Sequence, residues 1–72
     1  MDGFNLNLRS FALAKAFNQE YKTGDALIVH SLHGRMLWGR LQRPAMALGD
    51  QVIINLEGYT LCFHLDQVIG KA

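Results

Sequence analysis

The sequence predicts a mostly β fold preceded by one α-helix, and three observations predict it. Apolar residues recur at helical spacing before "KTGD" (residues 22–25) and at strand spacing after it. Turn signals then follow at His33-Gly34, Gly49-Asp50 and Gly58. With 72 residues the chain allows one domain, expected to span residues 1–72 with a helix at 4–22 and a bent β-sheet at 26–71.

The helix is predicted from an apolar stripe in a segment without proline. Its core members are Leu6, Leu13, Phe17 and Tyr21, widened by Phe11, Ala12, Ala14 and Ala16. Asn5 or Asn7 is expected to cap its start, and Gly24 to end it in the left-handed conformation. A helix lying on a membrane surface would need a basic face, whereas the basic residues here are scattered. We therefore expect the helix to pack on the sheet.

Four or five short antiparallel strands are expected to follow the helix. The predicted strands are residues 26–32, 35–41, 51–57, 59–65 and 67–71. Residues 42–49, "QRPAMALG", are expected to be a loop because Pro44 excludes a central strand. In the third strand Val52, Ile54 and Leu56 share one face. In the fourth strand the shared face holds Tyr59, Leu61, Phe63 and Leu65.

Gly39 interrupts a segment that otherwise reads as a strand. It has the same parity as Leu37 and Leu41, so it points toward the core, where a bent strand leaves no room for a side chain. A simple β-bulge is the alternative, and both interpretations imply curvature. Gly34 is expected to form the hairpin turn before it. Both glycines are therefore predicted to be critical for the fold.

The stretch "IVHSLHGRMLWGRL" resembles the first motif of the Sm-like family, which comprises Sm, LSm and bacterial Hfq proteins. Ile28, Val29, Leu32, Gly34, Leu37, Gly39 and Leu41 fall in register with it. "VIINLEGYTLCFHLDQVIG" resembles the second half of the family pattern. This resemblance to a divergent bacterial- or phage-type member implies a five-stranded, strongly bent antiparallel sheet, a small open barrel. It also implies a homo-oligomeric ring of about five to seven subunits, joined by pairing of the fourth strand with the last strand of the next copy. A monomeric SH3-like barrel can imitate the pattern.

The resemblance implies single-stranded RNA binding, in an RNA chaperone-type role. The expected contacts are Arg40, Gln42, Arg43, Met46 and His64 around the pore. Trp38 is expected either to stack on a base or to pack under the helix or between subunits. The net charge is only +1, so RNA binding would depend on a ring that repeats one basic patch. The family's uridine-pocket Asp and Asn are replaced by Ala45 and Gly49. A structural or protein-interaction ring that has lost the RNA site is therefore the alternative function.

Other classes of site find little support in the sequence. His30 and His33 face opposite sides of a strand, whereas a metal site needs three or four converging ligands. Cys62 is the only cysteine and has no evident activating partner. We expect no enzyme activity, cofactor or metal. No segment has the length of a membrane span or the pattern of a signal peptide, so a cytoplasmic protein is expected.

Overall fold

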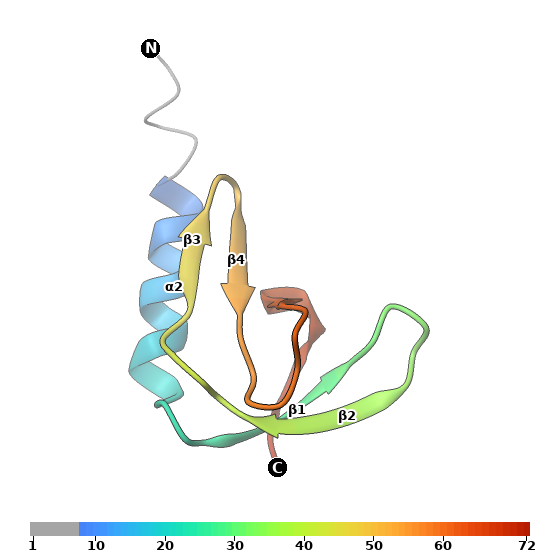
Figure 1. The fold of residues 1–72 in the computed structure, drawn as a ribbon. Helices are drawn as coiled ribbons and strands as arrows, with labels where there is room; N and C mark the ends of the chain where they lie inside the picture. The colour runs from blue at the N-terminus through green and yellow to red at the C-terminus, as the bar shows by residue number, and fades with distance from the viewer. Residues whose placement is uncertain (1–7) are drawn as a thin grey trace.

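The computed structural model describes residues 8–72, which form one helix followed by six strands (Figure 1). The elements are α2 (Leu8–Glu20), β1 (Ala26–His30), β2 (Met36–Arg40), β3 (Met46–Leu48), β4 (Gln51–Ile54), β5 (Phe63–His64), the 3-10 helix η1 (Leu65–Gln67) and β6 (Val68–Lys71). The mostly β class with one preceding helix is confirmed. The prediction of a single five-stranded sheet is wrong, because the strands form two three-stranded antiparallel sheets, β2-β1-β6 and β3-β4-β5, and neither closes.

Two predictions were wrong in extent, one for a loop and one for a strand. Residues 42–49 are not simply a loop, because β3 follows Pro44 and pairs with β4. The strand predicted at 59–65 is reduced to Phe63–His64. Gly58 has a φ of +87°, which turns the chain there, and Leu61 is 78% exposed instead of facing the core. A short turn-rich segment thus replaces most of the expected fourth strand.

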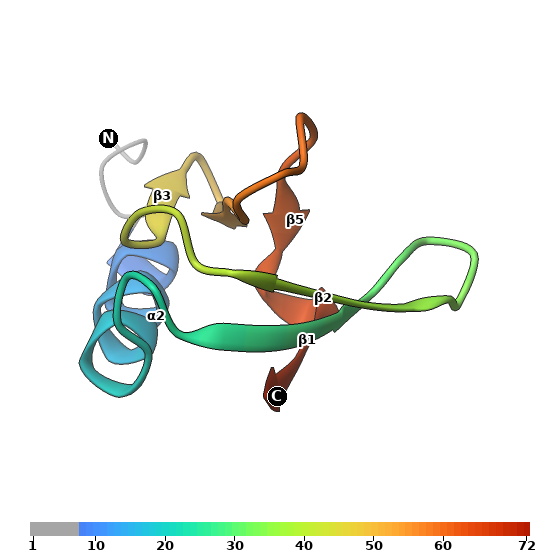
Figure 2. The same ribbon diagram turned by 60° about the horizontal axis from the view of Figure 1, so that its bottom comes forward.

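The two sheets meet where the chain leaves β2. An isolated antiparallel bridge joins Leu41 to Leu56, and the N–H of Gln42 donates to the carbonyl of Asn55 at 2.9 Å. Both leucines are fully buried. Figures 1 and 2 show the β1–β2 hairpin extending from this junction, away from the helix and the second sheet. The core lies between the sheets and the helix and consists of Ala14, Phe17, Leu27, Val29, Leu41, Ala45, Val52, Ile54, Leu56 and Phe63.

Helix α2 covers the outer edge of β3 with a polar and small-residue stripe. The Ser10 hydroxyl donates to the carbonyl of Gly49 at 2.7 Å. Asn18 donates its amide N–H to the carbonyl of Ala45 at 3.1 Å and accepts the Ala45 N–H at 2.8 Å. Ala14 lies between them on the same helix face and is buried. The edge of β3 is therefore closed to another strand.

The predicted apolar stripe of the helix was only partly correct. Phe17 is buried and Tyr21 is half-buried, and their rings pack with centroids 4.5 Å apart. Phe11 and Leu13 are exposed, because Ser10 and Asn18 occupy the face that meets the sheet. The helix ends at Glu20, two residues before the predicted end. Leu6 and the expected caps Asn5 and Asn7 lie outside the described residues.

The turn between helix and β1 is held by Asp25 and not by a glycine cap on the helix. Gly24 has a φ of +96° but lies four residues beyond the helix end. The N–H of Lys22 donates to the Asp25 carboxylate at 2.9 Å, and Lys71 of β6 lies 3.6 Å from the same oxygen. The Lys22 N–H is the main cause that lowers the pKa of Asp25 below its ordinary value, and Lys71 adds to the effect.

A buried glutamine joins β5 to β1. Gln67 accepts the backbone N–H of His64 through Oε1 at 2.9 Å and donates through Nε2 to the carbonyl of His30 at 2.9 Å. Its side chain is one of two buried polar side chains in the described part of the chain. Because both ends of the amide are hydrogen-bonded, these bonds offset the cost of burying it in this link between the two sheets.

Candidate nucleic-acid interface

The outward face of the β1–β2 hairpin carries an exposed aromatic ring. Ile28 lies directly opposite Trp38 and His30 opposite Met36, so these four side chains share one face. The opposite face points into the core through Leu27 and Val29, which are fully buried. Trp38 is 60% exposed and Met36 is 63% exposed. Within residues 8–72, Trp38 is therefore not packed under the helix, and stacking on a base or packing between subunits stays a prediction.

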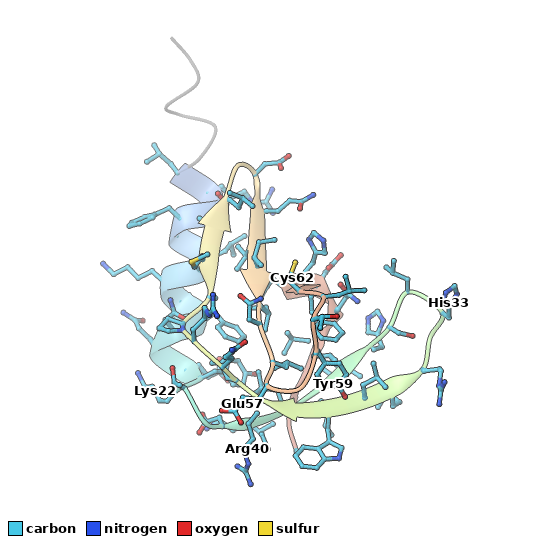
Figure 3. All side chains as sticks on the ribbon, viewed as in Figure 1. Lys22, His33, Arg40, Glu57, Tyr59 and Cys62 are labelled. Carbon is cyan, nitrogen blue, oxygen red and sulfur yellow. The ribbon has the colours of Figure 1, made fainter. Side chains whose placement is uncertain are left out.

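A shallow depression of about 590 Å³ opens beside Trp38, where β2 meets the turn after β4. Its lining residues are Trp38, Gly39, Arg40, Glu57, Gly58 and Tyr59. Figure 3 shows Arg40, Glu57 and Tyr59 together at the lower bend of the molecule. A planar ring, a cation, an anion and glycine backbone thus surround one surface site.

The site is held in place by hydrogen bonds between its two segments. The Tyr59 hydroxyl donates to the carbonyl of Trp38 at 2.9 Å, and the N–H of Glu57 donates to the carbonyl of Arg40 at 2.8 Å. Arg40 donates one guanidinium N–H to the carbonyl of Gly24 at 3.1 Å. A guanidinium has five N–H donors, so Arg40 keeps four for a ligand. The Tyr59 ring packs edge-on against buried Phe63, with centroids 5.5 Å apart.

Gly39 lies where β2 touches the segment that contains Leu56 and Tyr59. A Cβ atom on Gly39 would lie 3.0 Å from Cε2 of Tyr59, 3.2 Å from Cβ of Leu56 and 3.3 Å from Cδ1 of Leu56. Its φ is not positive, so the requirement for glycine is steric. Gly34 differs, because its φ of +84° forms the hairpin turn while no atom lies within 4 Å of its would-be Cβ.

The hairpin and the segment after it contain no acidic residue. From Ala26 to Gly49 the charged side chains are three arginines, Arg35, Arg40 and Arg43, accompanied by His30 and His33. The nearest carboxylates in sequence, Asp25 and Asp50, flank this segment, and Glu57 reaches it only through the fold. The net positive charge of this segment favours the approach of a polyanion.

The structure does not bring all the predicted contact residues together. Trp38 and Arg40 share the depression, while Gln42 and Arg43 are exposed in the connection that follows. Met46 and His64 lie on the second sheet, one on each side of Ile53, with which both are paired. The expected set thus divides between the two sheets of one subunit.

His64 lines a second, more mixed groove of about 810 Å³. The charged or titratable side chains around it are Arg9, His30, His64, Asp50 and Asp66. With neutral histidines, two carboxylates face one arginine, so this groove is less favourable for a polyanion than the depression beside Trp38.

Comparison with known proteins identifies no relative: no family model, curated protein or solved structure matches the chain. In the described part of the chain, no group of three or more His, Cys, Asp or Glu side chains could hold a metal ion. No helix among residues 8–72 is long and apolar enough to cross a membrane.

Two residues of the depression, Glu57 and Tyr59, are not among the predicted site residues. The strand pattern of the sequence predicts Glu57 at the end of one strand and Tyr59 on the apolar face of the next. The weak signal was Gly58, because a glycine turn between them brings both side chains back toward β2.

Proposed function

We propose that this chain binds single-stranded RNA as a homo-oligomeric ring with an Sm-like arrangement of its strands. The observation that carries the proposal is the exposed indole of Trp38 beside Arg40, on a hairpin without acidic residues. An unpaired base stacks on an exposed aromatic ring, and a guanidinium pairs with the adjacent phosphate. The ring is needed because one subunit carries a net charge of only +1.

The sheet edges support assembly through β5 and β6. Helix α2 closes the edge of β3, whereas β5 and β6 each pair with one strand only in the described chain. Pairing of β5 with β6 of the next copy would satisfy these two edges, while the outer edge of β2 is a third edge, where the carbonyl of Arg40 accepts the N–H of Glu57. Such a contact uses two different surfaces, so repeated copies close into a ring when the rotation allows.

RNA binding is tested by fluorescence anisotropy with labelled single-stranded oligomers, U-rich and A-rich, at 50 and 200 mM salt (roughly the range over which counterion release is measurable). We expect binding that weakens at the higher salt. Trp38→Ala should lose roughly 5- to 150-fold in affinity, which corresponds to about 1–3 kcal/mol for one stacked base. The matched control is Phe11→Ala, because Phe11 is 63% exposed but lies on the helix.

The result that contradicts RNA binding is an absence of measurable affinity for either oligomer at the lower salt. The ring is tested separately by native mass spectrometry. The expected particle is a multiple of the 8.1 kDa chain, and a particle of 8.1 kDa would exclude the ring.

A protein-interaction ring without RNA binding is the second candidate, and the exposed apolar side chains favour it. Leu32 is 88% exposed, and Leu48 and Leu61 also project from the surface. Replacing both Trp38 and Arg40 by Ala separates the two functions. RNA binding predicts lost affinity with an intact ring, whereas a protein-interaction ring predicts no functional change.

A further inference from the structure

The depression beside Trp38 has more functional groups than sequence-independent RNA binding requires. Stacking and phosphate contact require only Trp38 and Arg40. Glu57, whose backbone N–H bonds to Arg40, adds a carboxylate to the same lining, and an anion there opposes the binding of a phosphate backbone. No ion pair or side-chain hydrogen bond of Glu57 occurs within residues 8–72. This carboxylate is therefore available to a ligand that offers hydrogen-bond donors.

The arrangement discriminates between nucleobases. A carboxylate only accepts hydrogen bonds, and it accepts two when the donors are adjacent. Guanine presents two adjacent donors, N1–H and the N2 amino group, on its Watson–Crick edge. Adenine and cytosine place an acceptor beside their amino group, and uracil places its single N–H between two carbonyls. Of the four bases, only guanine matches both oxygens of Glu57.

The remaining lining residues fit the rest of a guanine nucleotide. Trp38 offers a ring face for stacking, and Arg40 keeps four N–H donors for the 5′-phosphate. Gly58 carries no side chain, and no atom lies within 4 Å of its would-be Cβ, which leaves room for a flat base. We propose that this depression is a guanine-selective nucleotide subsite, formed by Trp38, Arg40 and Glu57. The inference rests on the proposed RNA-binding function, whose base preference it specifies.

The experiment uses Trp38 as its own reporter, because it is the only tryptophan of the chain. The full chain is titrated with 5′-GMP, AMP, CMP and UMP while the tryptophan fluorescence is followed. We expect saturable quenching with GMP at concentrations at least about fivefold lower than with the other three, since a bidentate carboxylate contact discriminates by about 1–3 kcal/mol. In parallel, anisotropy compares an oligo-U strand with the same strand containing one central G.

Glu57→Gln is the decisive variant. Glutamine keeps the backbone N–H that bonds to Arg40 and the size of the side chain, but it replaces one acceptor oxygen by a donor. We expect the preference for GMP to disappear while oligo-U binding is retained or strengthened. The matched control is Asp50→Asn, an exposed carboxylate of the other groove, which should leave the GMP preference unchanged.

The outcomes separate the subsite from the wider function. Oligomers that bind without a preference for the G-containing strand, or a Glu57→Gln variant with unchanged GMP selectivity, overturn the guanine subsite and leave RNA binding intact. Selective quenching by GMP without any oligomer binding supports the subsite as a site for free guanine nucleotides and overturns RNA binding. Equal quenching by all four nucleotides overturns the subsite.

Discussion

Replacing Gly39 by Ala tests the packing at the junction of the two sheets. The new methyl group would lie 3.0 Å from Tyr59 and 3.2 Å from Cβ of Leu56. The Tyr59 ring is held by its hydrogen bond to the Trp38 carbonyl, and Cβ of Leu56 moves only with the backbone. Overpacking of this kind destabilises a protein by about 1–3 kcal/mol. Replacing glycine by alanine also stabilises the fold by about 0.4–1 kcal/mol, because it lowers the conformational entropy of the unfolded chain. The difference between these ranges is about 0–2.6 kcal/mol, and their central values give an expected net loss of about 1.3 kcal/mol.

Urea unfolding measures this loss for Gly39→Ala. For a domain of this size the denaturant dependence is near the lower end of the usual range, about 1 kcal/mol/M, so the midpoint should fall by about 1.3 M. Gly39→Val should lose more, because it adds two further methyl groups. Wild type and variants are compared at one protein concentration, since assembly couples to stability.

Gly34 supplies the matched control for Gly39. It has open space around its would-be Cβ but a φ of +84°. Asn tolerates this conformation, so Gly34→Asn should be milder than Gly34→Ala. At position 39 the ranking should reverse, because the restriction there is volume. A Gly39→Ala variant as stable as the wild type, or more stable, would refute the steric argument.

Three further predictions concern the links between elements. Asn18→Ala should cost about 1–3 kcal/mol in urea unfolding, since it leaves a buried strand edge unpaired, whereas Gln19→Ala on the exposed face should be neutral. Gln67→Ala should cost a similar amount, about 1–3 kcal/mol, because it removes the side chain that bonds to His64 of β5 and to His30 of β1. Stability equal to wild type would contradict this. The lowered pKa of Asp25 means that this carboxylate stabilises the fold above its unfolded value of 3.8, and the contribution is lost as the pH falls through the lower folded value. Asp25→Asn should therefore reduce the decrease in the free energy of unfolding as the pH is lowered below about 4. An unchanged decrease would show that Asp25 contributes nothing.

Local patterns in the sequence correctly predicted the helix, the β1–β2 hairpin and the buried positions Val52 and Ile54 of β4. Leu27 and Val29 alternate with half-buried residues, and Val52 and Ile54 are buried as their parity predicts. The core-facing position of Gly39 also followed from parity alone. These features depend on residues two to four positions apart, which a sequence displays directly.

Features that depend on distant contacts were missed. The helix meets the sheet through Ser10 and Asn18, whose partners lie 39 and 27 residues away. An apolar stripe cannot predict such a polar contact, so Phe11 was placed on the wrong face. Glu57 reaches the depression only because the chain turns at Gly58 and the two sheets meet. Each of these depends on tertiary geometry that local periodicity does not encode.

Ultraviolet cross-linking of the full chain to single-stranded RNA, followed by mass spectrometry of the peptides, tests the central proposal most directly. The proposal predicts that cross-linked nucleotides map to β2, at Met36–Arg40, and to the turn that contains Tyr59. Trp38→Ala should remove the cross-links in β2. Cross-links confined to helix α2, or none above the level of a protein that does not bind RNA, would contradict it.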